Sequence, residues 1–328
     1  KKRAMVSPAK VLGILVVLIS LTLSTYHFFP EALVRTKLKE QKIGVWGTPD
    51  VEINWCEEDY YLGDHVAEPF NTVTSLLYII LAAYAFGAHA SLGVPLRLRV
   101  LLLVIAAIGA GSTVFHGSLR YKMQLLDELP MYALVVGGLW CLVENEKDLR
   151  YGKALPLVAT VVYMAMCGVT LATDRQHTTH SVMRGFLVVS FALFFILFFY
   201  LFSAVTAPDI ARRLREMSGE RPSSEEERRI SSLLGILPTA FYQFVAALVC
   251  WLLDNFYCAI LSSLPFGIPY PQLHALGWHV LTAVGLYNIF LVLLLQRLLV
   301  EDGGGTHTLR RGMLLLPVLV KQAALKQD

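Results

Sequence analysis

The chain of 328 residues is 55% hydrophobic and only 16% charged, with a mean hydropathy of +0.56. Soluble domains carry about 25% charged residues, so the composition excludes an ordinary soluble protein and indicates a polytopic membrane protein. The formal net charge of +3 is small. Because no basic stripe with interleaved aromatic residues accompanies it, we expect no nucleic-acid partner, and no obligate protein partner is evident.

Eight apolar segments are long enough, or nearly so, to cross a hydrocarbon core that takes about 20 helical residues. We see no alternating strand pattern, and an open sheet cannot span lipid. The predicted fold class is therefore an all-α polytopic bundle of seven transmembrane helices, preceded by one extra N-terminal anchor helix. The segments cover roughly residues 11–29, 69–90, 99–117, 125–143, 154–173, 182–204, 234–258 and 273–299.

The first segment sets the predicted domain boundaries. Its solid apolar core also suits a signal peptide, but no small-x-small cleavage site follows it, so we favour an uncleaved anchor. Residues 1–43 then hold the cytosolic N-terminus, the anchor helix and a lumenal linker. Residues 44–300 form the seven-helix core, and residues 301–328 form a cytosolic tail.

Lysine and arginine residues gather in alternate loops and set the orientation, with both termini cytosolic. Residues 205–232 then form a charged cytosolic loop, which we interpret as a solvated linker with partial helix. Residues 30–68 face outside, although their basic residues run against this assignment. The apolar stretch 313–320 is too short to span and lies on the interface or packs against the bundle.

Three of the nine histidines lie at the outer ends of predicted helices, on the same side of the membrane and at similar depth. His116 ends the third segment, and His274 and His279 open the eighth. Ionisable residues at membrane depth are costly and usually functional, and three imidazoles match the ligand number of a catalytic zinc site. The alternative is a set of interfacial histidines, and the residues alone leave both interpretations open.

Three further polar residues lie near His116 in the sequence. Ser112 precedes His116 by one helical turn and either bonds a substrate oxygen or serves as a small packing residue. Asp127 and Glu128 open the fourth segment, where acids favour the helix N-terminus. We assign that capping role to Glu128, while Asp127 could instead orient or deprotonate a water molecule at the metal.

A cluster of oxygen ligands precedes the second segment. Hard oxygen ligands at close, irregular spacing suit Ca²⁺, although the pattern is not an EF-hand. An acidic surface loop is the alternative. The cluster consists of Asn54, Glu57, Glu58, Asp59, Asp64 and Glu68.

These residues closely resemble the alkaline ceramidase family, which is related to adiponectin-receptor-like membrane hydrolases. The resemblance runs from residue 44 to about residue 300, and the blocks MQLLDELPM and WCEE are its most specific parts. The matching pieces, in family order, are WGTPDVEINWCEEDYYLGDHVAEPFNT (46–72), GSTVFHGSLRYKMQLLDELPM (111–131), HSVMRGF (180–186), DNFYC (254–258) and HALGWHVLT (274–282).

The resemblance implies a zinc hydrolase of the endoplasmic reticulum or Golgi membrane, with its metal sites near the lumenal side. Its substrate is ceramide, including dihydro- or phytoceramide, and its products are a sphingoid base and a free fatty acid. The zinc ligands become His116, His274 and His279, while Ser112 and Asp127 flank the activated water. A receptor-like membrane protein with a structural metal site is the alternative function.

The resemblance also implies a calcium site near the zinc, as a structural and regulatory ion. Its ligands map onto Asn54, Trp55 through its carbonyl, Glu57, Asp59 and Glu68. The family's loop resembles Asp-Trp-Cys-Glu-Glu-Asn, whereas this chain has Asn54 and Asp59 at the two ends. The acid and the amide have exchanged places, so we expect a retained calcium site with altered geometry.

The spacing of the last two histidines departs from the family's His-x-x-x-His by one residue. On a regular helix, residues five apart lie about 140° from each other, so His274 and His279 could not face one metal. A π-bulge would absorb the extra residue, and Gly277 makes such a distortion easier. Alternatively, His274 precedes the regular helix. We keep both as ligands.

Cys56 and Cys258 both lie outside in the predicted topology. An endoplasmic reticulum or Golgi lumen is oxidising, so we predict a disulfide that ties the calcium loop to the seventh segment.

Overall fold

The structure is a computed structural model of the chain. The predicted anchor segment 11–29 lies outside the described residues, except for Gly13. The structure describes residues 42–51, 55–144, 151–172, 178–219, 222–258, 272–301 and 307–321, together with positions 13 and 261.

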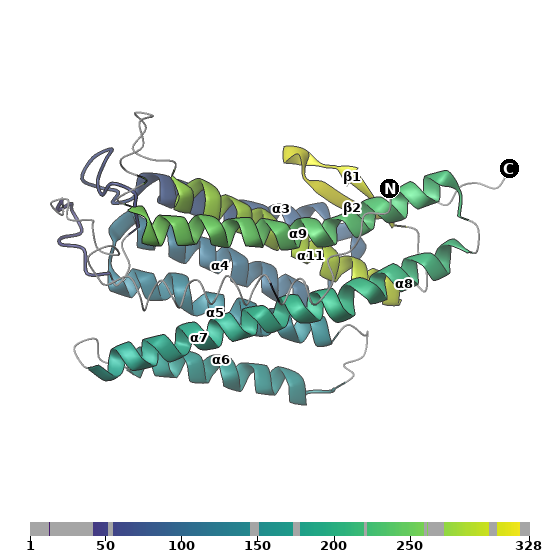
Figure 1. Cartoon of the computed structure of the whole chain (residues 1–328), viewed down its shortest axis with the longest axis horizontal. Helices are drawn as coiled ribbons and strands as arrows, with labels where there is room; N and C mark the ends of the chain where they lie inside the picture. The colour runs from purple at the N-terminus through teal and green to yellow at the C-terminus, as the bar shows by residue number, and fades with distance from the viewer. Residues whose placement is uncertain are drawn as a thin grey trace.

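Within these residues, seven spans are long and apolar enough to cross a membrane, which confirms the polytopic helical fold. They run side by side in an elongated bundle (Figure 1). Each of the seven predicted segments after the anchor is matched to within a few residues by a described helix, except that the helix over 234–258 begins ten residues early, at Ser224, and the regular helix over 273–299 begins at Val280. The long helices are α3 (Pro69–Ala88), α4 (Leu96–Ser118), α5 (Tyr121–Val143), α6 (Ala154–Ala172), α7 (Thr178–Leu201), α9 (Ser224–Phe256) and α11 (Val280–Glu301).

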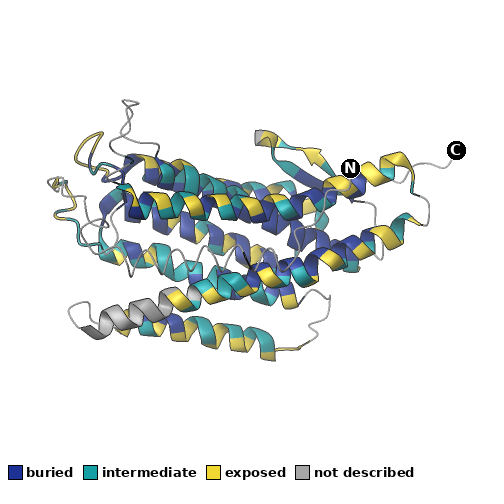
Figure 2. Ribbon diagram, in the orientation of Figure 1, coloured by how far each residue is buried: buried dark blue, intermediate teal, exposed yellow. Residues whose placement is uncertain are grey.

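The core lies along α11. All residues from Thr282 to Leu299 except Val284 are buried, and a helix that is apolar all round belongs in the interior of a bundle. Helices α3 and α9 pack against α11, α4 packs between α3 and α5, and α6 and α7 complete the far side. Figure 2 shows burial concentrated where helices face one another and exposed residues along the outer faces of α6 and α9.

The outer face of α6 is apolar. Leu157, Val161 and Met164 recur at helical spacing and are each about 60% exposed. A contiguous exposed apolar face is unusual for a soluble monomer and fits contact with lipid chains.

The stretch 205–232 is helical over most of its length, where we expected a solvated linker with partial helix. The π-helical turn η2 (Phe202–Thr206) joins α7 directly to α8 (Ala207–Ser218), and α9 begins at Ser224. Ile210 and Leu214 lie one turn apart on α8 and are fully buried. Their apolar stripe holds α8 against the bundle despite the charged residues around it.

The C-terminal stretch forms a hairpin that the all-helical prediction missed. Strand β1 (His307–Arg311) pairs antiparallel with β2 (Pro317–Lys321), and the short 3₁₀ turn η4 (Met313–Leu315) lies between them. The hairpin packs against the bundle, toward the end opposite the loop at 42–68 (Figure 1). Neither HTLRR nor PVLVK alternates apolar and polar residues, so the strands carry no clear signal in the sequence.

Candidate metal centre

Three buried histidines meet at one end of the bundle. His116 lies in the last turn of α4, whereas His274 and His279 lie in the π-helical turn η3 (Leu273–His279), which precedes α11. Their potential ligand nitrogens all lie within 4.8 Å of one another. In the part of the chain that the structure describes, no other set of three His, Cys, Asp or Glu side chains gathers in this way.

The π-helical turn explains the unusual spacing of the last two ligands. Hydrogen bonds in a π-helix join residues five apart, so His274 and His279 fall on one face. Of the two alternatives left open by the sequence, the structure therefore adopts the π-helical one. A Cβ atom on Gly277 would lie 2.5 Å from Cys250 Cβ, so only glycine lets this turn pack so closely on α9.

Each imidazole is held through Nδ1 by a side-chain oxygen at the start of α3. A metal-binding histidine usually makes such a bond with the nitrogen that does not bind the metal, which here leaves Nε2 as the ligand atom. The contacts are His116 to Glu68 Oε2 at 2.6 Å, His274 to Asn71 Oδ1 at 3.0 Å and His279 to Thr74 Oγ1 at 2.9 Å.

This donor set fits a divalent metal ion. Three imidazoles from two segments are the protein ligands of one type of catalytic zinc site, in which a fourth position is left for water or substrate. Burial keeps the site away from bulk solvent, because His116, His274 and His279 are each less than 5% exposed. The three predicted metal ligands can therefore hold one metal together.

Ser112 and Asp127, the two predicted catalytic residues, are hydrogen-bonded to each other beside the histidines. Ser112 is buried on α4, one turn before His116, and its Oγ also lies 3.0 Å from Ser75 Oγ. A Cβ atom on Gly111 would lie only 2.2 Å from the backbone oxygen of Leu126, so the missing side chain lets α4 and α5 meet here.

Glu128 does not cap α5, contrary to our assignment. The helix begins at Tyr121, whose N–H donates to the Asp50 carboxylate at 2.7 Å, so Asp50 fills the capping role. Glu128 lies in the second turn and accepts a hydrogen bond from Gln124 Nε2 at 2.8 Å. The helix begins four residues before the predicted apolar segment 125–143, because residues 121–124 form its first turn.

The predicted calcium ligands are only partly placed. Asn54 lies outside the described residues, and Asp59 is half-buried. Glu57 accepts the backbone N–H groups of Phe70 and Asn71 at 2.6 and 2.8 Å, so it caps α3. Glu68 is hydrogen-bonded to His116 through Oε2. The calcium site therefore stays a prediction.

Trp55, the predicted carbonyl ligand, has a different visible role. Its indole stacks on the imidazole of His274 with a centroid distance of 3.6 Å and an interplanar angle of 12°. The side chain therefore covers one face of a metal ligand.

The loop before α3 is tied to the end of α9. Cys56 and Cys258, the predicted pair, form a disulfide with a Cα–Cα distance of 5.4 Å. The buried carboxylate of Asp254 accepts the N–H groups of Cys56 at 3.0 Å and of His274 at 3.2 Å. One carboxylate thus links α9, the loop and the π-helical turn.

The comparison with known proteins identifies the family of this chain. A profile of the ceramidase family matches residues 47–318, which include the whole metal centre. The chain belongs to the ceramidase family.

Several alkaline ceramidases are similar to this ceramidase-family chain. Alkaline ceramidase YPC1 of Saccharomyces cerevisiae is 31% identical over 266 residues, covering 74% of this chain and 76% of the yeast protein. Alkaline ceramidase 3 of Mus musculus is 29% identical over 263 residues, covering 78% and 87%. The putative alkaline ceramidase dcd3B of Dictyostelium discoideum is 26% identical over 277 residues, covering 76% and 88%.

Sequence reasoning missed the polar face of α3 in this ceramidase. Asn71, Thr74, Ser75 and Tyr78 follow Glu68 at helical spacing within an otherwise apolar span. Polar residues at such spacing in a membrane helix point to the bundle interior, so the signal was present. The Tyr78 hydroxyl bonds the hydroxyl of Thr282 on α11, which continues the polar face toward the core helix.

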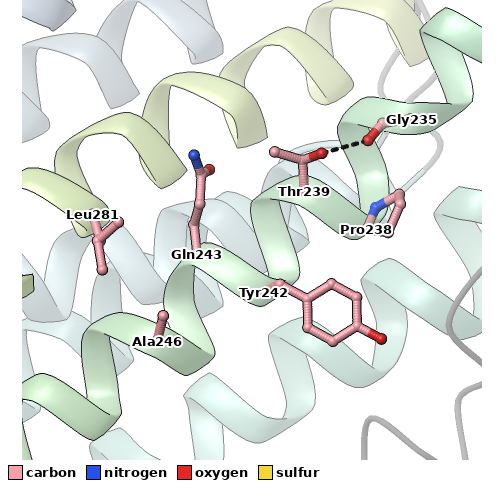
Figure 3. Close-up of a pocket in the computed structure, with 7 residues that line it drawn as sticks. All are labelled: Gly235, Pro238, Thr239, Tyr242, Gln243, Ala246 and Leu281. Atoms are coloured by element: carbon pink, nitrogen blue, oxygen red, sulfur yellow. Dashed lines mark hydrogen bonds between the residues drawn. The ribbon is translucent and has the colours of Figure 1, made fainter.

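A shallow pocket lies elsewhere, between α9 and α11 at the proline of α9 (Figure 3). The Thr239 hydroxyl donates to the carbonyl oxygen of Gly235 at 2.7 Å in this region. The pocket contains no metal-centre or catalytic residue, so we do not assign substrate chemistry to it. Its lining residues are Gly235, Pro238, Thr239, Tyr242, Gln243, Ala246 and Leu281.

Proposed function

We propose that the protein is an alkaline ceramidase that uses zinc, held by His116, His274 and His279, to hydrolyse the amide bond of ceramide. The products are a sphingoid base and a free fatty acid. The observation that carries this proposal is the convergence of three buried imidazoles within 4.8 Å, next to the hydrogen-bonded pair Ser112 and Asp127. The similar proteins that bear the name alkaline ceramidase supply the substrate class.

A lipid substrate suits the position of the site. The histidines lie at one end of a bundle whose outer faces are apolar, so a ceramide molecule can keep its chains in the bilayer while its amide reaches the site. When bound, the zinc supplies Lewis-acid activation of the attacking water and of the amide carbonyl.

Asp127 acts as the general base and then as the general acid. Its carboxylate takes a proton from the attacking water as the oxygen–carbon bond forms. It later returns that proton to the nitrogen of the sphingoid base as the carbon–nitrogen bond breaks. Asp127 therefore returns the proton that it accepted and ends the reaction in its starting protonation state.

The bond between Ser112 and Asp127 couples this proton transfer to oxyanion stabilisation. Before reaction, the single hydroxyl proton of Ser112 is donated to the Asp127 carboxylate. Once Asp127 is protonated, its own O–H can donate to Ser112 Oγ, which releases the serine proton toward the carbonyl oxygen as negative charge develops there. One such donor typically contributes about 3–4 kcal/mol to transition-state stabilisation.

The test measures fatty-acid release from ceramide by purified protein, with zinc quantified in every variant. We expect wild type to bind zinc and release fatty acid, and His279→Ala to lose both. Asp127→Ala should keep zinc while losing about 10²- to 10⁴-fold in activity, as is typical for loss of a general base. His65→Ala, which removes an exposed histidine, is the matched control and should resemble wild type.

A zinc-loaded wild type that releases no fatty acid across a range of pH and calcium concentration would overturn the ceramidase assignment and favour the receptor-like alternative. Asp127→Ala with full activity would overturn the assignment of the base.

We also propose the calcium site and the topology predicted from the sequence. Withholding calcium should lower fatty-acid release by wild type, and Asp59→Asn should raise the calcium concentration that restores it. We also propose placement in the endoplasmic reticulum or Golgi membrane with both termini cytosolic. A tag at the C-terminus should then be digested when protease is added to intact microsomes. Tags protected until detergent is added would reverse the orientation.

A further inference from the structure

The hydrogen-bond acceptors of the three imidazoles share one short stretch of sequence. Glu68, Asn71 and Thr74 are spaced three residues apart, so they rise along one side of the first turns of α3. A single rigid element therefore contacts all three candidate metal ligands, although these come from α4 and from the π-helical turn.

The network around Asn71 fixes how its amide points. Its Nδ2 donates to Glu68 Oε2 at 3.3 Å, and a carboxylate oxygen can only accept. Its Oδ1 therefore faces His274 Nδ1 at 3.0 Å and must accept the imidazole proton. His274 is held with hydrogen on Nδ1, which leaves the lone pair of Nε2 for a metal.

Thr74 imposes the same tautomer on His279 by a different route. Its hydroxyl proton is donated to the backbone oxygen of Phe70 at 2.8 Å, with Asn71 O as a longer second acceptor at 3.2 Å. A hydroxyl has one proton, so Thr74 Oγ1 must accept at its 2.9 Å contact with His279 Nδ1.

We propose that Asn71 and Thr74 are positioning residues that hold His274 and His279 in the Nδ1–H tautomer with Nε2 available to the metal. The inference rests on the metal binding set out in the proposed function. Without these side-chain acceptors the two imidazoles would be held less firmly in this tautomer and orientation, and part of the binding free energy would be used to reorder them. Loss of such a partner typically weakens metal binding by 10- to 100-fold.

Thr74→Val tests the proposal, because it keeps the shape of the side chain and removes the side-chain acceptor, which leaves the backbone oxygen of Asn71 as the remaining hydrogen-bond partner of the His279 imidazole. We expect metal affinity, measured for zinc by competition with a chromogenic chelator, to fall by about 10- to 100-fold. Thr74→Ser restores a hydroxyl and should restore the affinity. Thr72→Val is the matched control, because the Thr72 hydroxyl makes the same kind of bond to a helix oxygen, Glu68 O at 2.7 Å.

A second measurement reads the tautomer directly. Nitrogen NMR of metal-free protein with labelled histidine separates Nδ1–H from Nε2–H imidazole. We expect one histidine to lose its pure Nδ1–H signal in Thr74→Val, and a different histidine to do so in Asn71→Leu.

The outcomes separate the two proposals. Wild type that binds no metal would overturn the proposed function. Wild type that binds metal, with Thr74→Val equal to it in affinity and in histidine tautomer, would overturn the positioning role alone. Thr74→Ser as weak as Thr74→Val would also overturn it, because the hydroxyl would then not be the cause.

Discussion

At Gly111 the backbones of α4 and α5 approach too closely for any side chain. A Cβ atom there would lie 2.2 Å from the backbone oxygen of Leu126 and 2.7 Å from the backbone nitrogen of Asp127. Backbone atoms cannot move aside as the end of a flexible side chain can. The hydrogen bond between Ser112 and Asp127 therefore depends on a residue that takes no part in the chemistry.

Gly111→Ala should separate catalysis from metal binding. The added methyl group must push α5 away, carrying Asp127 from Ser112, while His116 keeps its contacts with α3. We expect fatty-acid release to fall by about 10²-fold or more, as for loss of a positioned acid–base group, with zinc content unchanged. Overpacking of this kind also costs about 1–3 kcal/mol of stability, which a thermal unfolding scan would detect.

Gly117→Ala is the control on the same helix, because a Cβ atom there meets nothing closer than Thr72 at 4.0 Å. It should retain activity. Equal losses in the two variants would mean that any added methyl group on α4 is harmful and that the close approach at Gly111 has no special role.

At the scale of elements, a helix could be predicted where its own sequence carries a clear pattern of apolar residues. The spans were found because an unbroken run of about 20 apolar residues is typical of a membrane helix and rare in soluble domains. The packing of α8 against the bundle was missed because its charged residues conceal the apolar pair Ile210 and Leu214. The polar face of α3 carried a spacing signal, but its partners, such as His274, lie about 200 residues away, so only the folded bundle shows what it contacts.

The metal ligands themselves were predictable from topology, but their geometry was not. Three histidines at the same end of the bundle can be read from span boundaries alone. Whether His274 and His279 share a face depends on the π-helical turn, which needs the packing of Gly277 against α9. Sequence spacing could therefore pose two alternatives but not choose between them.

One hydrogen bond between the C-terminal hairpin and the bundle is made by a titratable residue, His89. His89 follows α3 and is fully buried. Its Nδ1–H donates to Ala85 O at 2.8 Å, so its Nε2 must accept the N–H of Leu319 at 3.1 Å. Burial lowers the pKa of His89 below its ordinary value. Protonation would place a hydrogen on Nε2 against that N–H group.

We therefore expect the hairpin to be held less tightly in acid. The folded protein binds the His89 proton more weakly than the unfolded chain does. The contribution of neutral His89 to folding stability is thus complete above the pKa of the unfolded chain, about 6.5, and is lost as the pH falls through the lower pKa of the folded protein. Amide hydrogen exchange of residues 318–321, corrected for intrinsic rates, should speed up several-fold over that fall.

His89→Gln provides the control, because its side-chain oxygen can still accept the Leu319 N–H but does not titrate. Exchange in this variant should not depend on pH after the same correction. If the pH dependence persists, His307, which is also buried in the hairpin, would become the responsible group.

At the scale of the whole molecule, the two ends of the bundle are secured in different ways. The hairpin is held without a covalent link, by the buried Leu319 in the hydrophobic core and by hydrogen bonds with His89 and Tyr287. The metal-centre end is joined covalently, because the disulfide between Cys56 and Cys258 links residues 202 positions apart. Cys56 also lies between Trp55, which stacks on His274, and Glu57, which caps α3. The cross-link thus holds both the helix that orients the histidines and the cover over one of them.

Removing that cross-link should loosen the metal without abolishing the site. In a variant with both Cys56→Ser and Cys258→Ser, the loop can leave the end of α9, and the stacking of Trp55 on His274 becomes intermittent. We expect zinc to be released to excess chelator about 10-fold faster, equivalent to about 1.4 kcal/mol of activation free energy. The serine pair avoids thiol reductants, which themselves bind zinc. Cys167→Ser, a buried cysteine on α6, is the control and should release zinc at the wild-type rate. Equal release rates in all three proteins would show that α3 and the π-helical turn hold the metal site without help from the loop.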